Sequence, residues 1–174
     1  YGQTDEVAAL AQAASGFTNA FYVSHARLWG GNHVKAVEEA IEIGRRAGVP
    51  VQYSHMAIID SRAYGDGQDM VGPIERARAQ GMDVTYDMYP YTAAGSHLSQ
   101  SVPTWLQAGG NHAMVQRLRD PEQRRRALEE IKQGQFGDIP WEFDTVVIAY
   151  VQSEENRGLI GKTVEEIAGE REED

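Results

Sequence analysis

Along the first 90 residues, segments with the apolar spacing of a helix alternate with short apolar runs typical of strands. Helices are expected at 4–14, where a polar first turn precedes apolar residues, and at 33–47, where apolar positions share one face before Gly48. A shorter helix is expected at 70–80, with its start nearer Pro73 because proline suits a first helical turn. Short β-branched and aromatic runs at 20–24, 49–54 and 82–87 predict strands between these helices.

Strands therefore recur about every 30 residues with helices between them. This alternation predicts an α/β protein whose parallel sheet is covered by helices on both faces. Two architectures fit the pattern, a segment of a (β/α)-barrel and an open doubly wound sheet.

The pattern loosens after residue 92, so the chain divides by composition into three stretches of one domain. Core βα units occupy 1–92, and a loop and helical excursion, with a charged helix near 121–133, occupies 93–140. An apolar run at 145–151 predicts a fourth strand within the last stretch, 141–174, which ends in an acidic helix.

The composition excludes several classes of partner. A net charge of −10 without a basic stripe disfavours nucleic acid and anionic membrane surfaces. No apolar run approaches the roughly 20 residues of a membrane span and no signal peptide opens the chain, so a cytoplasmic protein is expected. The chain begins with Tyr rather than Met, and 174 residues fall short of the roughly 250 of a whole barrel, so we expect a piece of a longer protein.

Two histidines stand at matching places in the predicted pattern. His25 and His55 each follow a serine at the end of a predicted strand, 30 positions apart, which is one βα unit. The ends of neighbouring parallel strands lie at the same rim, where two imidazoles would suit zinc or a similar ion. Because the chain has no cysteine, any metal must be held by His, Asp or Glu. Spacing alone leaves a structural role for each histidine equally open.

The other three histidines, His33, His97 and His112, are expected to be ordinary surface or capping residues.

Several longer stretches resemble a known family. They are YVSHAR at 22–27, EEAIEIGRRAGVPVQYSH at 38–55, DVTYDMYPYTAAGS at 83–96, WLQAGG at 105–110, RLRDPEQRRR at 117–126 and GKTVEEIA at 161–168. Together they resemble the N-acyl-D-amino-acid deacylase (D-aminoacylase) branch of the amidohydrolase superfamily. The resemblance implies a partial (β/α)8 TIM barrel of the metal-dependent hydrolase type, covering roughly strands 5 to 7 with their helices.

The resemblance also implies a chemistry. His25 and His55 would bind a catalytic centre of one or two zinc ions, while Tyr89 and Ser96 would hold the substrate carboxylate. The reaction would be hydrolysis of the N-acyl bond of an N-acyl-D-amino acid or related small molecule, with the ion polarising the carbonyl and activating water. Asp87 is interpreted as a structural residue at the strand end rather than a base.

The chain departs from the family pattern at the position of a carboxylate-binding lysine, two residues after the second histidine. Here that position is Ala57, and Arg27 is an alternative partner for the anion. The family's first-strand histidine pair and catalytic aspartate also have no counterpart, so no catalytic residue is assigned and the chain alone is expected to be inactive.

Two other classes stay open at this point. One is a non-catalytic binding or assembly module derived from the barrel, and the other is a small open-sheet ligand-binding domain. A piece of a barrel would leave a strand edge unpaired, which favours a homo-oligomer formed through that edge.

Overall fold

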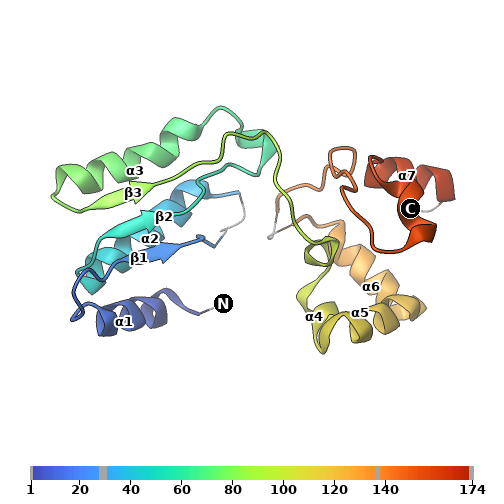
Figure 1. Ribbon diagram of the computed structural model, residues 1–174, viewed down its shortest axis with the longest axis horizontal. Coiled ribbons are helices and arrows are strands. Elements are labelled where there is room, and N and C mark those ends of the chain that lie inside the picture. Colours follow the sequence, from blue (N-terminus) through green and yellow to red (C-terminus); the bar gives the residue numbers. More distant parts are fainter. Residues whose placement is uncertain (1, 28–30, 136–137, 173–174) are drawn as a thin grey trace. The chain divides into compact units, whose positions relative to one another are not determined.

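The computed structural model describes residues 2–27, 31–135 and 138–172, and it divides into two compact units, 1–139 and 140–174 (Figure 1). The first unit begins with alternating helices and strands. These are α1 (Thr4–Ala14), β1 (Tyr22–Ser24), α2 (His33–Ala47), β2 (Val51–Tyr53), α3 (Gly67–Ala79) and β3 (Val84–Tyr86). Three helices follow, namely α4 (Thr104–Gln107), α5 (Gly110–Arg119) and α6 (Pro121–Ile131). The second unit contains α7 (Val164–Arg171).

The three strands form one parallel sheet in the order β1-β2-β3. Tyr22 pairs with Val51, and Val51 pairs in turn with Val84, so equivalent positions of the strands lie side by side. The predicted α/β class and the parallel pairing are confirmed. Each pair of neighbouring strands is joined through a helix, as parallel pairing requires.

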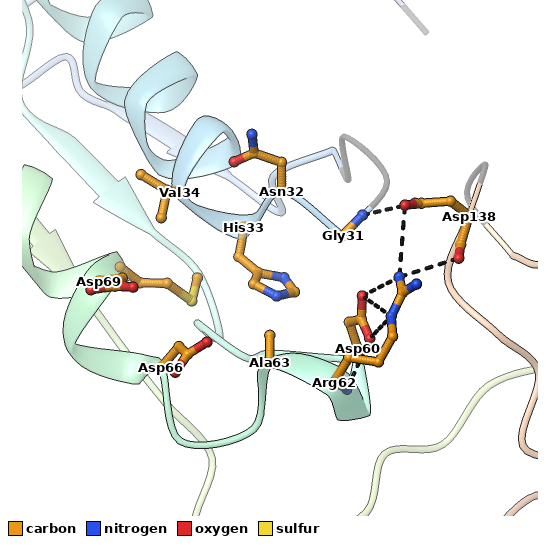
Figure 2. Close-up of a pocket in the computed structure, with 11 residues that line it drawn as sticks. Gly31, Asn32, His33, Val34, Asp60, Arg62, Ala63, Asp66, Asp69 and Asp138 are labelled. Carbon is orange, nitrogen blue, oxygen red and sulfur yellow. Dashed lines mark hydrogen bonds and ion pairs between the residues drawn. The ribbon is translucent and has the colours of Figure 1, made fainter.

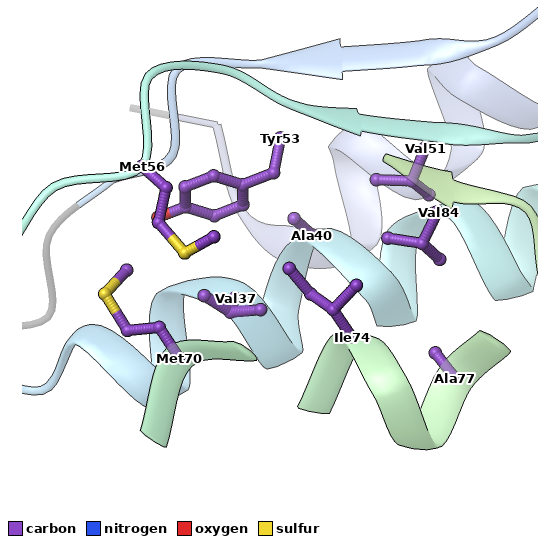
Figure 3. Packing of buried hydrophobic residues seen from close by; sticks show 9 residues of the cluster. All are labelled: Val37, Ala40, Val51, Tyr53, Met56, Met70, Ile74, Ala77 and Val84. Carbon is purple, nitrogen blue, oxygen red and sulfur yellow. The ribbon is translucent and has the colours of Figure 1, made fainter. Parts of the chain in front are cut away.

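One face of this sheet is packed against helices. Figure 3 shows side chains of α2 and α3 meeting those of β2 and β3 on the same side of the strands. On the other face Val23 is 49% exposed and Thr85 is also exposed. The expected helical cover on both faces is therefore absent from the described residues, because successive strands are added in one direction and their connecting helices fall on one side. The buried cluster comprises Val37, Ala40, Val51, Tyr53, Met56, Met70, Ile74, Ala77 and Val84.

The ends of α2 agree with the sequence prediction, whereas the start of α3 does not. Asn32 caps α2 by accepting a hydrogen bond from the Lys35 N–H, and Gly48 ends it with a φ of 68°, a left-handed conformation that glycine adopts without strain. Helix α3 begins at Gly67, so the expected start near Pro73 is wrong. The helix continues through Pro73 without the backbone hydrogen bond of that residue, and burial of Met70, Pro73 and Ile74 stabilises both sides of the proline.

The second unit lacks the predicted strand at 145–151. Within its described residues this run makes a single antiparallel bridge, between Val147 and Thr163, and Val147 is 53% exposed. The run contacts a loop instead of a neighbouring strand, so no ladder extends from the bridge. Thr163 also caps α7 through reciprocal hydrogen bonds with Glu166, as expected for the acidic terminal helix. None of the helices described is long and apolar enough to cross a membrane.

A glycine on α2 allows the helix to approach β2 closely, which generates a prediction about stability. A Cβ atom at Gly44 would lie 2.0 Å from Val51 Cγ2, so Gly44→Ala should lower the free energy of unfolding by about 1–3 kcal/mol through overpacking. Gly67→Ala is the matched control, since a Cβ there meets nothing within 4 Å. Urea denaturation of both variants measures the effect, and equal stability of the two would contradict it.

Candidate metal centre

The carboxyl ends of the three strands place polar residues at one edge of the sheet. His25 follows β1 directly, His55 lies two residues beyond β2, and Asp87 follows β3. Ser24 pairs with Tyr53, and Tyr53 pairs with Tyr86, so the three strands end at the same level. The register therefore brings His25 and His55 together although they are 30 residues apart.

The two imidazole rings are in direct contact. Nδ1 of His25 lies 3.2 Å from Nε2 of His55, and the ring centroids are 4.7 Å apart with the planes tilted by 49°. Both side chains are exposed in the described part of the chain. Two nitrogen ligands bonded to one tetrahedral zinc ion at about 2.0–2.1 Å would lie roughly 3.3 Å apart, so the pair fits a shared ion.

The pair would be part of a metal site rather than a whole one. Among the described residues, no group of three or more His, Asp and Glu side chains is arranged to hold a metal ion. A four-coordinate zinc site needs further ligands or water. Without a metal, the same nitrogen separation allows a hydrogen bond between neutral rings, with the direction set by their tautomers.

A cavity of about 690 Å³ opens beside the two histidines. Tyr89 lies in its lining, as does Ala57, the residue at the family's lysine position. Tyr53 borders it from the core side, and burial raises the pKa of this phenol. The loop after β3 contributes the remaining wall, which contains Tyr91, Ala93, Ala94 and Gly95. The cavity thus combines the candidate metal ligands with apolar walls and phenol groups.

The other two predicted substrate-binding residues lie in different surroundings. Ser96 is exposed and follows the lining residue Gly95 directly in the chain. Arg27 pairs with Glu39 of α2, with Nε 3.0 Å from Oε2, and both side chains are largely buried. Thr4 donates a further hydrogen bond to Glu39. A carboxylate substrate would therefore have to compete with Glu39 for Arg27, and the roles of Arg27 and Ser96 stay predictions.

Known proteins were compared with this sequence and structure. No family model matches the chain. A D-aminoacylase of Alcaligenes xylosoxydans xylosoxydans is 38% identical over 45% of this chain and 16% of its own length. An N-acyl-D-glutamate deacylase of the same organism is 34% identical over 53% of the chain and 19% of its own length. The crystal structure of a D-aminoacylase superposes with a TM-score of 0.62 and 26% identity, over 98% of this chain and 27% of that protein.

The chain resembles one segment of a D-aminoacylase. The expected family resemblance is thereby confirmed. A further solved structure, an N-acyl-D-glutamate deacylase of Bordetella bronchiseptica complexed with zinc and a phosphonate inhibitor, is 23% identical and shares the fold with a TM-score of 0.66. The chain spans less than a third of the length of each of these proteins.

A second cavity, of about 540 Å³, lies where α2 and α3 begin (Figure 2). His33 points into it and is 6% exposed, so its predicted surface or capping role is wrong. Neither ring nitrogen has a hydrogen-bond partner within the described residues. The nearby carboxylates and the guanidinium of Arg62 give this cavity mixed charge. The carboxylates are those of Asp60, Asp66, Asp69 and Asp138.

Asp60 and Arg62 form a closer ion pair in this second cavity than Arg62 forms with Asp138. Arg62 Nη2 lies 2.6 Å from Asp60 Oδ2, Nε lies 2.8 Å from Oδ1, and the Arg62 backbone N–H also donates to Oδ1. The Asp60 side chain is 4% exposed. These hydrogen bonds from Arg62 hold the pKa of Asp60 below its usual value, and they outweigh the effect of burial, which acts in the opposite direction.

The pair predicts a pH-dependent contribution to stability. Because the pKa of Asp60 is lower in the folded state, the pair stabilises the fold above about pH 4, and this contribution is lost as the pH falls through the folded value. Arg62→Ala should therefore reduce the melting temperature at pH 7 more than at pH 3. Arg125→Ala, which breaks an exposed helical pair with Glu129, should have little effect at either pH. An equal loss from Arg62→Ala at both pH values would contradict the prediction.

Proposed function

We propose that this chain is the segment around strands 5 to 7 of a (β/α)8-barrel amidohydrolase. In a closed barrel, neighbouring strands follow each other in sequence and their helices lie on the outer side. The order β1-β2-β3 and the cover of one face by α2 and α3 support this architecture over a doubly wound sheet, in which helices cover both faces. The exposed face with Val23 and Thr85 would then line the barrel interior.

The observation that carries the function is the 3.2 Å approach of His25 Nδ1 to His55 Nε2 at the ends of adjacent strands. Active sites of such barrels lie at the carboxyl ends of the strands. The two histidines would supply two of the ligands of a zinc centre. A bound zinc ion would polarise the scissile carbonyl and make water a stronger nucleophile at neutral pH.

The substrate would be an N-acyl-D-amino acid or a related compound. Tyr89 lines the same cavity as the histidines, and its phenol can donate a hydrogen bond to a carboxylate. Ser96 follows the lining loop and would add a second donor. Ala57 supplies no charge where the family has a lysine, so the carboxylate would be bound by neutral donors or by an arginine released from its partner. These residues would orient the substrate and so raise the rate through positioning.

The isolated chain would not catalyse this reaction. A carboxylate that accepts the proton from water and further metal ligands would come from other parts of the barrel. In the described residues β1 pairs only with β2, and the exposed apolar side chains of Leu10 and Phe21 line one cavity together with Tyr22 and Val23 of β1. In the whole protein the other edge of β1 would pair with another strand, whereas the isolated chain would self-associate through it.

Substitution of the two histidines tests the metal site in the full-length protein. His25→Ala and His55→Ala should each lower the zinc affinity. The loss should exceed the roughly 10–100-fold that is typical when a residue hydrogen-bonded to a metal ligand is removed. Hydrolysis of N-acyl-D-amino acids should be lost in parallel. His112→Ala, which removes an exposed histidine, is the control. Zinc content measured by mass spectrometry decides the question, and unchanged content in both variants would favour a non-catalytic binding module.

A second substitution tests how the carboxylate is bound. Ala57→Lys places a cation in the cavity lining, and a charged hydrogen bond contributes about 1.5–3 kcal/mol, equivalent to roughly 10–150-fold in kcat/KM. We expect this gain for N-acyl-D-amino acids but not for the corresponding C-terminal amides. Ala57→Met, of similar length without charge, is the control. An equal change with both substrate types would show that residue 57 does not face the carboxylate.

A further inference from the structure

We propose that Asp87 is a positioning residue that holds His55 in the backbone conformation needed to bind metal beside His25. The proposal rests on the function proposed above for His55. Asp87 stands at the end of β3, and the sequence marks it only as a structural residue. Its contacts show what it fixes.

The backbone of His55 has an unusual conformation. Its φ is +39°, in the left-handed region that residues with a side chain rarely adopt. Such a conformation persists only where the surroundings hold it. In this conformation the ring turns toward the neighbouring strand end, where Nε2 lies 3.2 Å from Nδ1 of His25. The contact between the rings therefore depends on whatever holds the backbone of His55.

The Asp87 carboxylate is bonded through one oxygen to β2 and through the other to His55, two residues beyond that strand. Oδ1 accepts the His55 backbone N–H at 2.6 Å, and Oδ2 accepts the Gln52 side-chain amide at 2.7 Å. The first bond holds the residue whose φ is positive. The second bond orients the carboxylate, because Gln52 lies within β2 and is further fixed by a hydrogen bond from Thr85.

The backbone of Asp87 forms hydrogen bonds with residues on both sides of His55. Its N–H donates to the Tyr53 carbonyl at 3.2 Å, and its carbonyl accepts the Met56 N–H at 2.8 Å. Asp87 thus bonds to the chain before His55, at His55 itself and after it. The position of the carboxylate is set by the sheet, while the position of His55 is set by the carboxylate.

Loss of the carboxylate should release His55. Without an acceptor for its N–H, the residue can relax to a negative φ, and its ring then turns away from His25. Asp87→Ala should weaken zinc binding by about 10–100-fold, the range typical of residues that orient a metal ligand. Asp87→Asn retains one acceptor oxygen of the same reach, so it should restore most of the affinity lost in Asp87→Ala.

The test uses the full-length protein and zinc alone as the probe, with affinity measured by competition against a chromogenic chelator. Asp83→Ala is the matched control, because Asp83 is an exposed aspartate just before β3, at its opposite end. Native affinity in Asp87→Ala would overturn the proposal. Equal losses in Asp87→Ala and Asp87→Asn would also overturn it, since a general loss of stability would then explain both.

A crystal structure of the zinc-free Asp87→Ala variant separates this proposal from the function on which it rests. We expect His55 to leave the left-handed region and the distance between the two ring nitrogens to increase. If His55 keeps its positive φ, Asp87 is not the residue that holds it, whatever the zinc affinity. If the native protein and His55→Ala bind zinc equally, the proposed metal function fails. The crystal structure of Asp87→Ala still shows, in that case, whether Asp87 holds the backbone of His55.

Discussion

The parallel backbone pairing of β1, β2 and β3 is the interaction on which the candidate site depends. Each strand has only three residues, so the ladder contributes few hydrogen bonds, but it sets the level at which all three strands end. His25, His55 and Asp87 come to one edge because of that shared level. A shift of one residue in the pairing register would move every side chain of a strand to the other face of the sheet. It would also separate the imidazole rings of His25 and His55.

The sheet keeps its register because one face is firmly packed. Val51 and Val84 pair across the sheet and are both buried against α2 and α3 (Figure 3). The helix that joins β1 to β2 fits closely because Gly44 leaves room for Val51. Met56, just after His55, is also buried in this cluster, so the loop that carries His55 is anchored to the core.

The sequence predicted those features that depend on local signals. Helix α2 could be predicted to the residue because its apolar face ends at a glycine, and the histidine pair followed from the spacing of two strand ends. Features that depend on distant contacts were missed. The burial of His33 depends on packing around α3, and the run at 145–151 could have formed a strand only beside a suitable neighbour. The ion pair of Arg27 could not be predicted, because its partner, Glu39, lies twelve residues away on α2.

On the proposed function, the positions of the candidate residues allow the substrate preference to change while the two histidines keep their places. His25 and His55 are held by the sheet and by Asp87, so their spacing depends on the backbone. Ala57, Tyr89 and Ser96 lie in the segments that follow β2 and β3, outside the ladder. An exchange of lysine for alanine at position 57 therefore changes the charge of the cavity while the strand ends keep their register. On the proposed function, this is the change expected when selection acts on the substrate and the zinc chemistry is retained.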